Sequence, residues 1–445
     1  MNKKTNLIFF VTTILIFSFA VASYSYNSAT KNYPIGPQIN TSDSVLIFAP
    51  HPDDESLSSA GLIRYCVEHN VPVHVVVVTN GGNGKLGIIR HSETLNATEK
   101  LGLSPNNVTF LDYPQVVDRL FSENWDPNHA YTAGAPHNSF AFQNNSSYCG
   151  ESLESNFETM IQKYQPTIII YPGLDDDNTD HWGTGSFVDY AVNNMGYHAK
   201  MYSYLVHNDE TLWPFPRSYY PQSNLLPPSY LTNQTNWLIF PLSNSLEQYK
   251  FNAVNCYQSQ MKKDPVFLKS YVRTNELFAV DPIINVTRQN TTTDYTKSNG
   301  FPMTVFHDPV GDILNKPDDH MYSVFEDKNS YDINDVGFEI DNNTLWISVK
   351  TTGGISKDGT YMFHLRGFGE DGVSRIDFII QKGNFIYIMP SSNSVKPKLS
   401  VRSNTAGIVV GIPAMNDDHA FMIDVDAGNQ TQMLDRTGYF NVDVS

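Results

Sequence analysis

From Ser44 onward, short hydrophobic runs alternate with segments whose apolar residues recur at helical spacing. The runs are nearly continuous and rich in β-branched residues, which is typical of strands buried on both faces of a sheet. We predict strands over 44–49, 71–79, 107–113 and 167–172, and helices over 59–70, 88–102, 152–164 and 184–195. Strands separated by such helices form βαβ units. The pattern therefore predicts an α/β fold, with a Rossmann-like, mainly parallel sheet and helices on both faces.

After about Asn290 the pattern changes to short segments in which apolar and polar residues alternate, separated by turn residues. Short strands at such regular intervals are typical of a β-sandwich. We predict a linker over 27–43, an α/β domain over 44–285, a linker over 286–300 and an all-β sandwich over 301–445. Two loop-rich insertions interrupt the α/β pattern at about 114–150 and 208–241, and long ordered loops often form lids or binding walls.

The N-terminal residues differ from both regions. Lys3 and Lys4 precede an apolar run that extends from Leu7 to Ala22, which is the pattern of a signal peptide or signal anchor over 1–26. The run is short for a membrane-spanning helix, which needs roughly 20 apolar residues. Glycosylation sequons agree with export, among them Asn107, Asn233, Asn285 and Asn429. We expect an extracellular or cell-surface protein, tethered to the membrane if the segment is retained.

Composition narrows the choice of function. The net charge of −17 disfavours binding to nucleic acid, which requires clustered Lys and Arg. An aromatic content of 13% argues against disorder over most of the chain. The three cysteines give no disulfide framework, although Cys149 and Cys256 could pair while Cys66 stays buried. Nothing in the sequence predicts a protein partner.

The stretch "VLIFAPHPDDE" places His51, Asp53, Asp54 and Glu55 directly after the first predicted strand. These titratable groups resist burial together unless a divalent cation lies among them. His181, in "DDDNTDH", follows another strand, and sites of parallel sheets lie at the carboxyl ends of the strands. His51, Asp54 and His181 would leave coordination positions open, as in a catalytic zinc site. The same ligand set also suits Fe(II).

These motifs resemble the PIG-L/LmbE family of zinc-dependent N-acetylglucosamine deacetylases. The matching segments are "HPDDE", "TNGGNG", "GIIRHSETLNATEKLG" and "DDDNTDH", over about 44–196, and the helix "YKFNAVNCYQSQ" extends the resemblance to about residue 265. The resemblance implies that His51, Asp54 and His181 bind zinc and that Asp53 is the general base.

The resemblance also assigns roles around the ligands. Arg90 and Glu93, from the "R-x-x-E" segment, would lie at the substrate site, where Arg90 contacts the substrate and Glu93 braces the site. Asp180 would hold a ligand imidazole or the base in place. Gly82 stands where many members carry a glutamate, which leaves the sugar contacts open.

A second departure concerns the proton donor. Asn178 occupies the position at which many members have a histidine that protonates the leaving amine or stabilises the oxyanion. Asn178 can donate a hydrogen bond to an oxyanion, but it cannot transfer protons. Asp53 acting as both base and acid, or His129 or His137 from the first insertion, could take this role.

The remaining histidines and the C-terminal region have no predicted catalytic role. We expect His74 to be a structural strand residue, and His91 and His207 to be lesser candidates for the site. The C-terminal region resembles glucodextranase C-terminal-like (DOMON-related) sandwiches through "DPVGD", "YDINDVGFEID" and "TLWISVKT", which implies a carbohydrate-associated module. We expect the acidic loop of that region to be solvated rather than to bind Ca²⁺, although it holds Asp308, Asp312, Asp318 and Asp319.

Residues and resemblance together predict an exported zinc-dependent hydrolase that removes acetyl from an N-acetylglucosamine-type sugar. The substrate would be an N-acetylated glycan, glycolipid or polysaccharide. Two alternatives stay open, namely a carbohydrate-binding protein with a decayed deacetylase domain and a metal-dependent amidase for another N-acyl substrate.

Overall fold

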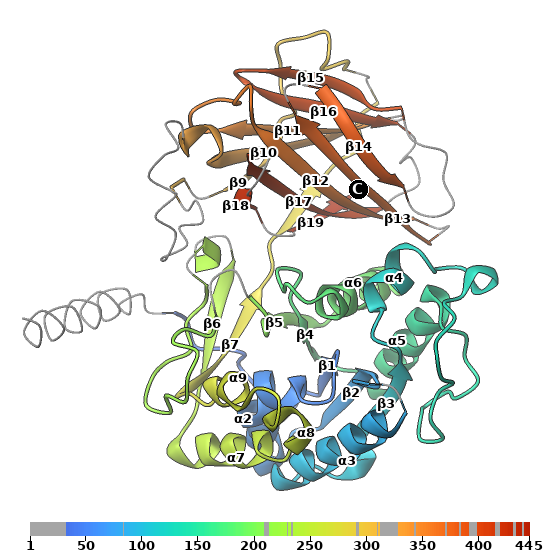
Figure 1. Ribbon diagram of the computed structural model, residues 1–445, viewed down its shortest axis with the longest axis vertical. Coiled ribbons are helices and arrows are strands. Elements are labelled where there is room, and N and C mark those ends of the chain that lie inside the picture. The colour runs from blue at the N-terminus through green and yellow to red at the C-terminus, as the bar shows by residue number, and fades with distance from the viewer. Residues whose placement is uncertain are drawn as a thin grey trace, which may run out of the picture.

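The computed structural model describes residues 33–82, 84–208, 213–228, 230–232, 235–290, 293–308, 310–311, 328–341, 344–369, 372–381, 384–390, 398–413, 419–429, 433–437 and 440–445. The N-terminal segment 1–26 lies outside them, as do Asp312, Asp318 and Asp319, so the expectations for these residues stay predictions. An α/β region and an all-β region follow each other along the chain and lie one above the other in Figure 1. In the part of the chain described, no helix has the length and apolar character needed to cross a membrane.

The α/β region is built on a seven-stranded sheet with the order β3-β2-β1-β4-β5-β7-β6. Its strands are β1 (Val45–Ala49), β2 (Val73–Thr79), β3 (Val108–Tyr113), β4 (Ile168–Pro172), β5 (Lys200–Tyr204), β6 (Asn236–Pro241) and β7 (Asn275–Val280). The strands from β3 to β5 are parallel, and β7 is antiparallel to both of its neighbours. The predicted mainly parallel sheet is confirmed, while the four predicted strands do not include β5, β6 or β7.

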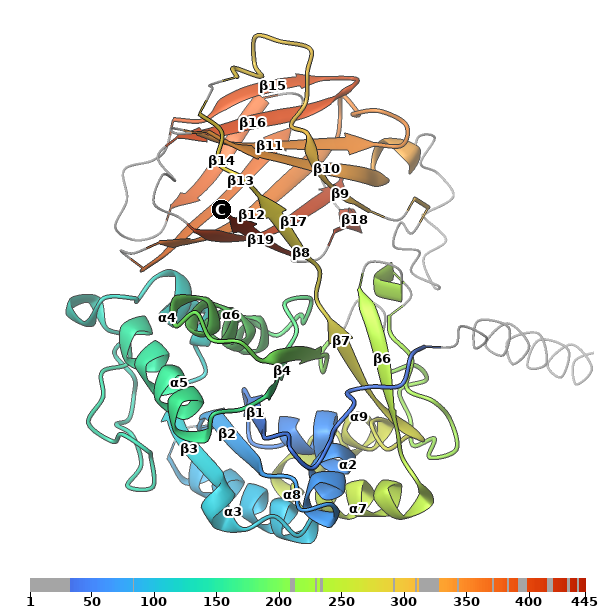
Figure 2. The same cartoon turned by 180° about the vertical axis from the view of Figure 1, so that it is seen from behind.

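Helices cover both faces of this sheet (Figures 1 and 2). Successive strand residues point to opposite faces, so Val45 and Ile47 belong to one apolar core and Leu46 and Phe48 to another. The first core is covered by α2 (Asp54–Glu68), α3 (Lys85–Lys100), α7 (Asn244–Val254) and α9 (Pro265–Ser270), and the second by α4 (Val117–Ser122), α5 (Gly150–Tyr164) and α6 (Thr179–Asn194). A short helix, α8 (Gln258–Met261), lies against α3 and α9.

Two helices begin five residues earlier than their apolar patterns predict. Helix α2 starts at Asp54 rather than Ser59, and α6 starts at Thr179 rather than Thr184. Their first turns are acidic, and negative charge there is stabilised by the positive end of the helix dipole. Consequently Asp54, Asp180 and His181 lie on rigid first helical turns rather than on loops.

The all-β region is a sandwich of two sheets, as predicted. One sheet has the order β15-β16-β11-β10-β9, and the other has the order β14-β13-β12-β17-β19-β8 with β18 paired to β17. The strands are β8 (Ile283–Val286), β9 (Thr304–His307), β10 (Ile333–Ile340), β11 (Thr344–Thr351), β12 (Thr360–Gly369), β13 (Gly372–Gln381), β14 (Asn384–Pro390), β15 (Ser400–Asn404), β16 (Gly407–Pro413), β17 (Ala420–Gly428), β18 (Met433–Arg436) and β19 (Phe440–Val444). Strand β8 pairs with β19, so the boundary that we expect after residue 285 falls inside a strand of the sandwich.

Candidate metal centre

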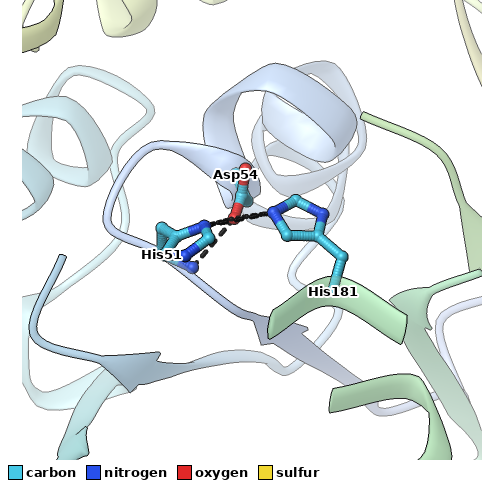
Figure 3. A group of neighbouring side chains, drawn as sticks. All are labelled: His51, Asp54 and His181. Carbon is cyan, nitrogen blue, oxygen red and sulfur yellow. Dashed lines mark hydrogen bonds and ion pairs between the residues drawn. The ribbon is translucent and has the colours of Figure 1, made fainter. Parts of the chain in front are cut away.

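Three buried side chains converge at the carboxyl end of the central strands (Figure 3). His51 follows β1, Asp54 begins α2, and His181 lies in the first turn of α6. Asp54 Oδ2 lies 3.3 Å from His51 Nδ1 and 3.1 Å from His181 Nε2, and the two ring nitrogens are 3.1 Å apart. The structure therefore brings together the three residues predicted as metal ligands, although they are 130 positions apart in the chain.

Each imidazole has a carboxylate on its other side. His51 Nε2 lies 3.0 Å from Asp180 Oδ2, and His181 Nδ1 lies 3.1 Å from Asp176 Oδ2, in an ion-pair contact rather than a well-aligned hydrogen bond. Asp180 accepts a hydrogen bond from the Val117 N–H. Such carboxylates fix the ring orientation of metal-bound histidine and raise its basicity. Asp180 thus has the predicted orienting position beside an imidazole, and sequence reasoning missed Asp176.

Asp176 is itself held firmly in place. Its carboxylate accepts hydrogen bonds from the backbone N–H groups of Asn178, Val206 and His207, at 2.8 to 3.0 Å. These donors connect the loop after β4 with the segment after β5. The orientation of His181 therefore depends on two separate strand ends.

The donor set fits a divalent cation. In the neutral tautomers whose outer N–H groups face the carboxylates, the inner nitrogens of His51 and His181 present lone pairs toward each other and toward Asp54. Three mutually repelling acceptors at 3.1 to 3.3 Å need positive charge between them. Ligands about 2.0–2.1 Å from a tetrahedral zinc ion would themselves be separated by about 3.3 Å. The same three ligands would also serve Fe(II).

The pKa shifts of His181 and Asp54 also favour a cation at this position. Burial lowers the pKa of His181, but Asp176 and Asp54 more than offset this, so the pKa lies well above its usual value. Burial would raise the pKa of Asp54, yet His181 and His51 hold it well below its usual range. The site therefore stabilises added positive charge, and a divalent ion would balance the carboxylates of Asp54, Asp176 and Asp180.

Asp53 lies beside this centre in a strained backbone conformation. Its φ of 138° falls in a region that non-glycine residues rarely adopt, and such strain often marks functional sites. Burial raises the pKa of Asp53 to about 6, although the Arg90 guanidinium opposes the shift. Arg90 Nη2 donates to Asp53 Oδ1 at 2.9 Å and to the Pro52 carbonyl at 2.6 Å, and Nη1 donates to the Gly81 carbonyl. The guanidinium thus holds the candidate base and the two loops around it.

Glu93, on the same helix as Arg90, braces the structure. Its two carboxylate oxygens accept hydrogen bonds from the N–H and hydroxyl of Ser259 in α8, both at 2.7 Å. These contacts support the predicted bracing role of Glu93. Contact of Arg90 or Glu93 with a substrate stays a prediction.

The asparagine that replaces the family histidine is engaged as a helix cap. Asn178 Oδ1 accepts a hydrogen bond from the Asp180 N–H at 3.0 Å, which satisfies a free donor at the start of α6. His207 lies closer to the centre than expected, because its ring is 4.8 Å from that of His181 and stacks on Phe267. The only sequence signal for His207 is its place after a strand.

The two histidines of the first insertion have other surroundings. His137 lies near the backbone carbonyls of Asp112 and Ser146, and the His129 side chain is exposed beside Asp126. The expectation for His74 agrees with its contacts, since it lies 2.8 Å from Thr109 Oγ1 and stacks on Tyr164. All three cysteines are free thiols, so the Cys149–Cys256 pair does not form in this structure.

A small cavity of about 130 Å³ lies between the loop after β2 and the first insertion. Val116, which lines it, precedes the Val117 whose N–H holds Asp180. The first insertion therefore contacts the carboxylate that orients His51, while its role as a lid or binding wall stays a prediction. The cavity is lined by Asn80, Pro114, Gln115, Val116, Tyr131, Ala133 and Gly134.

The fold and the site define an α/β domain with a two-histidine, one-aspartate centre at the carboxyl ends of parallel strands. Residues 46–192 match the family described as "PIG-L: GlcNAc-PI de-N-acetylase". These residues are therefore a PIG-L family domain, which confirms the resemblance over 46–192, while its extension to about residue 265 stays a prediction.

Individual relatives cover different parts of the chain. A "Probable N-acetylglucosaminyl-phosphatidylinositol de-N-acetylase" of Schizosaccharomyces pombe (strain 972 / ATCC 24843) is 32% identical over 122 residues, which is 27% of this chain. The chain spans about half (47%) of that relative's length. Among solved structures, the A40926 pseudoaglycone deacetylase Dbv21 is 14% identical with a TM-score of 0.37, covering 54% of this chain and 97% of that one. The N,N'-diacetylchitobiose deacetylase from Pyrococcus horikoshii is 18% identical with a TM-score of 0.33, covering 53% and 82%.

Proposed function

We propose that the protein is an exported, zinc-dependent de-N-acetylase that acts on an N-acetylglucosamine-type sugar. One observation carries the proposal, namely that His51, Asp54 and His181 direct three donor atoms at one point while Asp176 and Asp180 orient the imidazoles. The PIG-L domain supports the reaction class, and the relative's name supports the sugar. The N-terminal segment 1–26 supports export.

Metal held by His51, Asp54 and His181 would act as a Lewis acid, polarising the amide carbonyl and making water more acidic. Asp53 would accept the proton of the attacking water, and a pKa of about 6 leaves it ionised near neutral pH. Arg90 keeps the Asp53 carboxylate in a single orientation. The water oxygen bonds to the acetyl carbon, the carbon–nitrogen bond breaks, and acetate leaves.

The leaving nitrogen must gain a proton. Asn178 is not the source, because an amide side chain does not titrate and its oxygen caps α6. Asp53 can return the proton that it took from water. His207 is a second candidate, since it is partly buried with its ring 4.8 Å from that of His181 in the segment after β5. We propose Asp53 as the shuttle and His207 as a donor to the developing oxyanion.

The alternative of a decayed domain has little support in this geometry. A binding protein would not need to retain both ligand histidines, both orienting carboxylates and a strained Asp53. The second alternative, an amidase for another N-acyl group, shares every one of these residues. Only a comparison of substrates separates it from the proposal.

The test measures acetate released by the purified full chain from N-acetylglucosamine, chitooligosaccharides and N-acetylglucosaminyl-phosphoinositol, together with the metal content. We expect metal-dependent release that a chelator abolishes and zinc restores. Asp53→Asn should lower the rate by about 10²- to 10⁴-fold while metal content stays unchanged. The exposed Asp358→Asn serves as a control. If the protein hydrolyses other N-acyl compounds but none of these sugars, the sugar assignment is wrong. If acetate is released without metal, the mechanism is wrong.

A further inference from the structure

The sandwich turns one sheet toward the α/β region (Figures 1 and 2). Along β12, Phe363 and Leu365 point into the sandwich core, so His364, Arg366 and Phe368 point outward. Along β17, Phe421, Ile423 and Val425 point inward, so Ala420, Met422, Asp424 and Asp426 share the outer face.

The first part of this outer face is fixed against α4 and α6 by apolar packing. Phe368, Ala420 and Met422 belong to the same core as the helices, and the Phe368 ring lies 5.8 Å from Phe121 and 5.3 Å from Tyr190. Asn441 also donates a hydrogen bond to Asp189 of α6 at 3.2 Å. This buried contact gives the sheet a defined position over α6.

Further along β12 the sheet reaches the start of α6. The Arg366 guanidinium lies over the Trp182 ring at 5.2 Å, and Arg436 Nη1 lies 3.7 Å from Asp177 Oδ1. Trp182 directly follows His181, and Asp177 directly follows Asp176, which orients His181. The outer face therefore extends past the helix start to residues that directly adjoin His181 and Asp176 in the chain.

At this point the sheet carries a charged group that we call the rim cluster, comprising His364, Arg366, Asp377, Asp424, Asp426 and Arg436. His364 lies 3.1 Å from Asp377 and 3.2 Å from Asp426, Arg366 donates to Asp377 at 2.8 Å, and Arg436 donates to Asp424 at 3.1 Å. The side chains of Arg366, Asp377 and Asp424 are at most 9% exposed, whereas those of His364 and Arg436 are 26% and 21% exposed. The buried side chains of Arg366, Asp377 and Asp424 thus hold the partly exposed side chains of His364 and Arg436 in place.

The chemistry of this edge suits a sugar that has no negative charge. Imidazole, carboxylate and guanidinium groups are planar, and pairs of them offer the adjacent donors and acceptors that vicinal hydroxyls need. Asp177, Asp377, Asp424 and Asp426 outnumber Arg366 and Arg436, so the local charge is negative when His364 is neutral. That balance repels phosphate and tolerates a neutral hydroxyl or an ammonium group.

We propose that the exposed edge of the rim cluster, His364, Asp426 and Arg436 together with Asp177, is a subsite for the sugar next to the one that loses its acetyl group. The proposal rests on the proposed function and deepens it, since it makes the substrate an oligomer or polymer of N-acetylglucosamine and glucosamine. The sandwich then contributes directly to substrate selection.

The test compares wild type with His364→Gln and Asp426→Asn of the full chain. For each protein, acetate release from tri-N-acetylchitotriose and from N-acetylglucosamine gives a ratio of kcat/KM values. Each variant should lower this ratio about five- to tenfold, as expected for loss of one or two hydrogen bonds. Asp335→Asn is the matched control, because Asp335 lies between His307 and Lys350 on the other sheet and should leave the ratio unchanged.

Equilibrium binding of the same sugars separates this proposal from the proposed function. If wild type releases no acetate but binds the trisaccharide more tightly than the monosaccharide, and Asp426→Asn removes the difference, the subsite stands while the reaction fails. If release occurs but neither variant changes the ratio, the subsite is wrong while the reaction stands. Stronger binding of N-acetylglucosamine carrying a phosphate aglycone would also overturn the subsite.

Discussion

The candidate metal centre and the rim cluster both place histidine among carboxylates, but the ring nitrogens point differently in the two groups. In the centre, His51 and His181 each turn one nitrogen toward an orienting carboxylate and the other toward a common point with Asp54. In the rim cluster, both nitrogens of His364 lie near carboxylates of the cluster itself. The direction of the ring nitrogens, rather than the composition, therefore distinguishes an ion site from a hydrogen-bonded cluster.

The balance of charge differs as well. Asp54, Asp176 and Asp180 have imidazoles as their nearest side-chain partners, and the Arg90 guanidinium is bound to Asp53 rather than to any of them. In the rim cluster, Arg366 and Arg436 supply permanent positive charge to the aspartates. The first group needs an added cation, while the second is already stabilised by the chain's own side chains.

The largest expected effect comes from removing a donor from the centre. In structural zinc sites with four protein ligands, a binding free energy of about 10–16 kcal/mol corresponds to about 2.5–4 kcal/mol per ligand, so His181→Ala should weaken zinc affinity by about 60- to 700-fold. His364→Ala should leave zinc affinity unchanged. Competition with a chromophoric chelator measures both affinities, and replacing zinc with Co²⁺ reports the coordination geometry. A loss of zinc in both variants would remove the distinction between the two groups.

A smaller effect is expected when an orienting carboxylate is neutralised. Asp176→Asn and Asp180→Asn keep the shape of the side chain but lose the charge that fixes each imidazole. Either change should lower metal affinity by about 10- to 100-fold. Asp377→Asn, which removes the corresponding carboxylate beside His364, is the matched control.

The same competition assay applies to this comparison, with thermal unfolding as a check on folding. Unchanged metal affinity in Asp176→Asn would contradict the orienting role, because this carboxylate accepts three backbone hydrogen bonds and would then serve the loop alone. A weakened affinity in Asp377→Asn would show that the sandwich influences the centre.

Much of the fold could be predicted because the signals are local. Continuous β-branched runs predict the central parallel strands, and alternating residues predict the sandwich. The helix starts at Asp54 and Thr179 were harder, since their first turns are polar and charged and resemble loops. Strand β6 lies at the end of the second loop-rich insertion, and β7 follows the helices α7, α8 and α9. Their pairing with each other at one edge of the sheet depends on tertiary contacts.

The site residues could be predicted from the sequence where they belong to a recognisable motif. His51 and Asp54 share one turn, and His181 ends a distinctive acidic stretch. Asp176 is one of three consecutive aspartates, and only the folded loop shows which of them faces His181. The nearness of His207 depends on the packing of the β5 segment against α6 and α9, which no local pattern encodes. No local sequence pattern predicts the position of the sandwich over α6 either.

A third cluster of carboxyl groups, at the junction of the two regions, extends the comparison because Asp189 there is hydrogen-bonded to neutral side chains, those of Tyr171 and Asn441. Asp189 of α6 lies near Asp281, Asp443, Tyr171 and Asn441, and burial followed by the charge of Asp281 raises the pKa of Asp189 to about 8. Such a group must keep a proton in the folded protein at neutral pH.

The smallest predicted effect follows from that proton. Between the unfolded pKa of about 4 and the folded pKa of about 8, the folded state holds one more proton, so raising the pH lowers the free energy of unfolding by up to about 1.4 kcal/mol per pH unit. Asp189→Asn should remove this contribution, leaving stability similar at pH 5 and higher than wild type at pH 8. Urea unfolding across this range measures the difference, with the exposed Asp358→Asn as control. Parallel curves for wild type and Asp189→Asn would show that Asp189 does not hold the proton, and would place it on Asp281 instead.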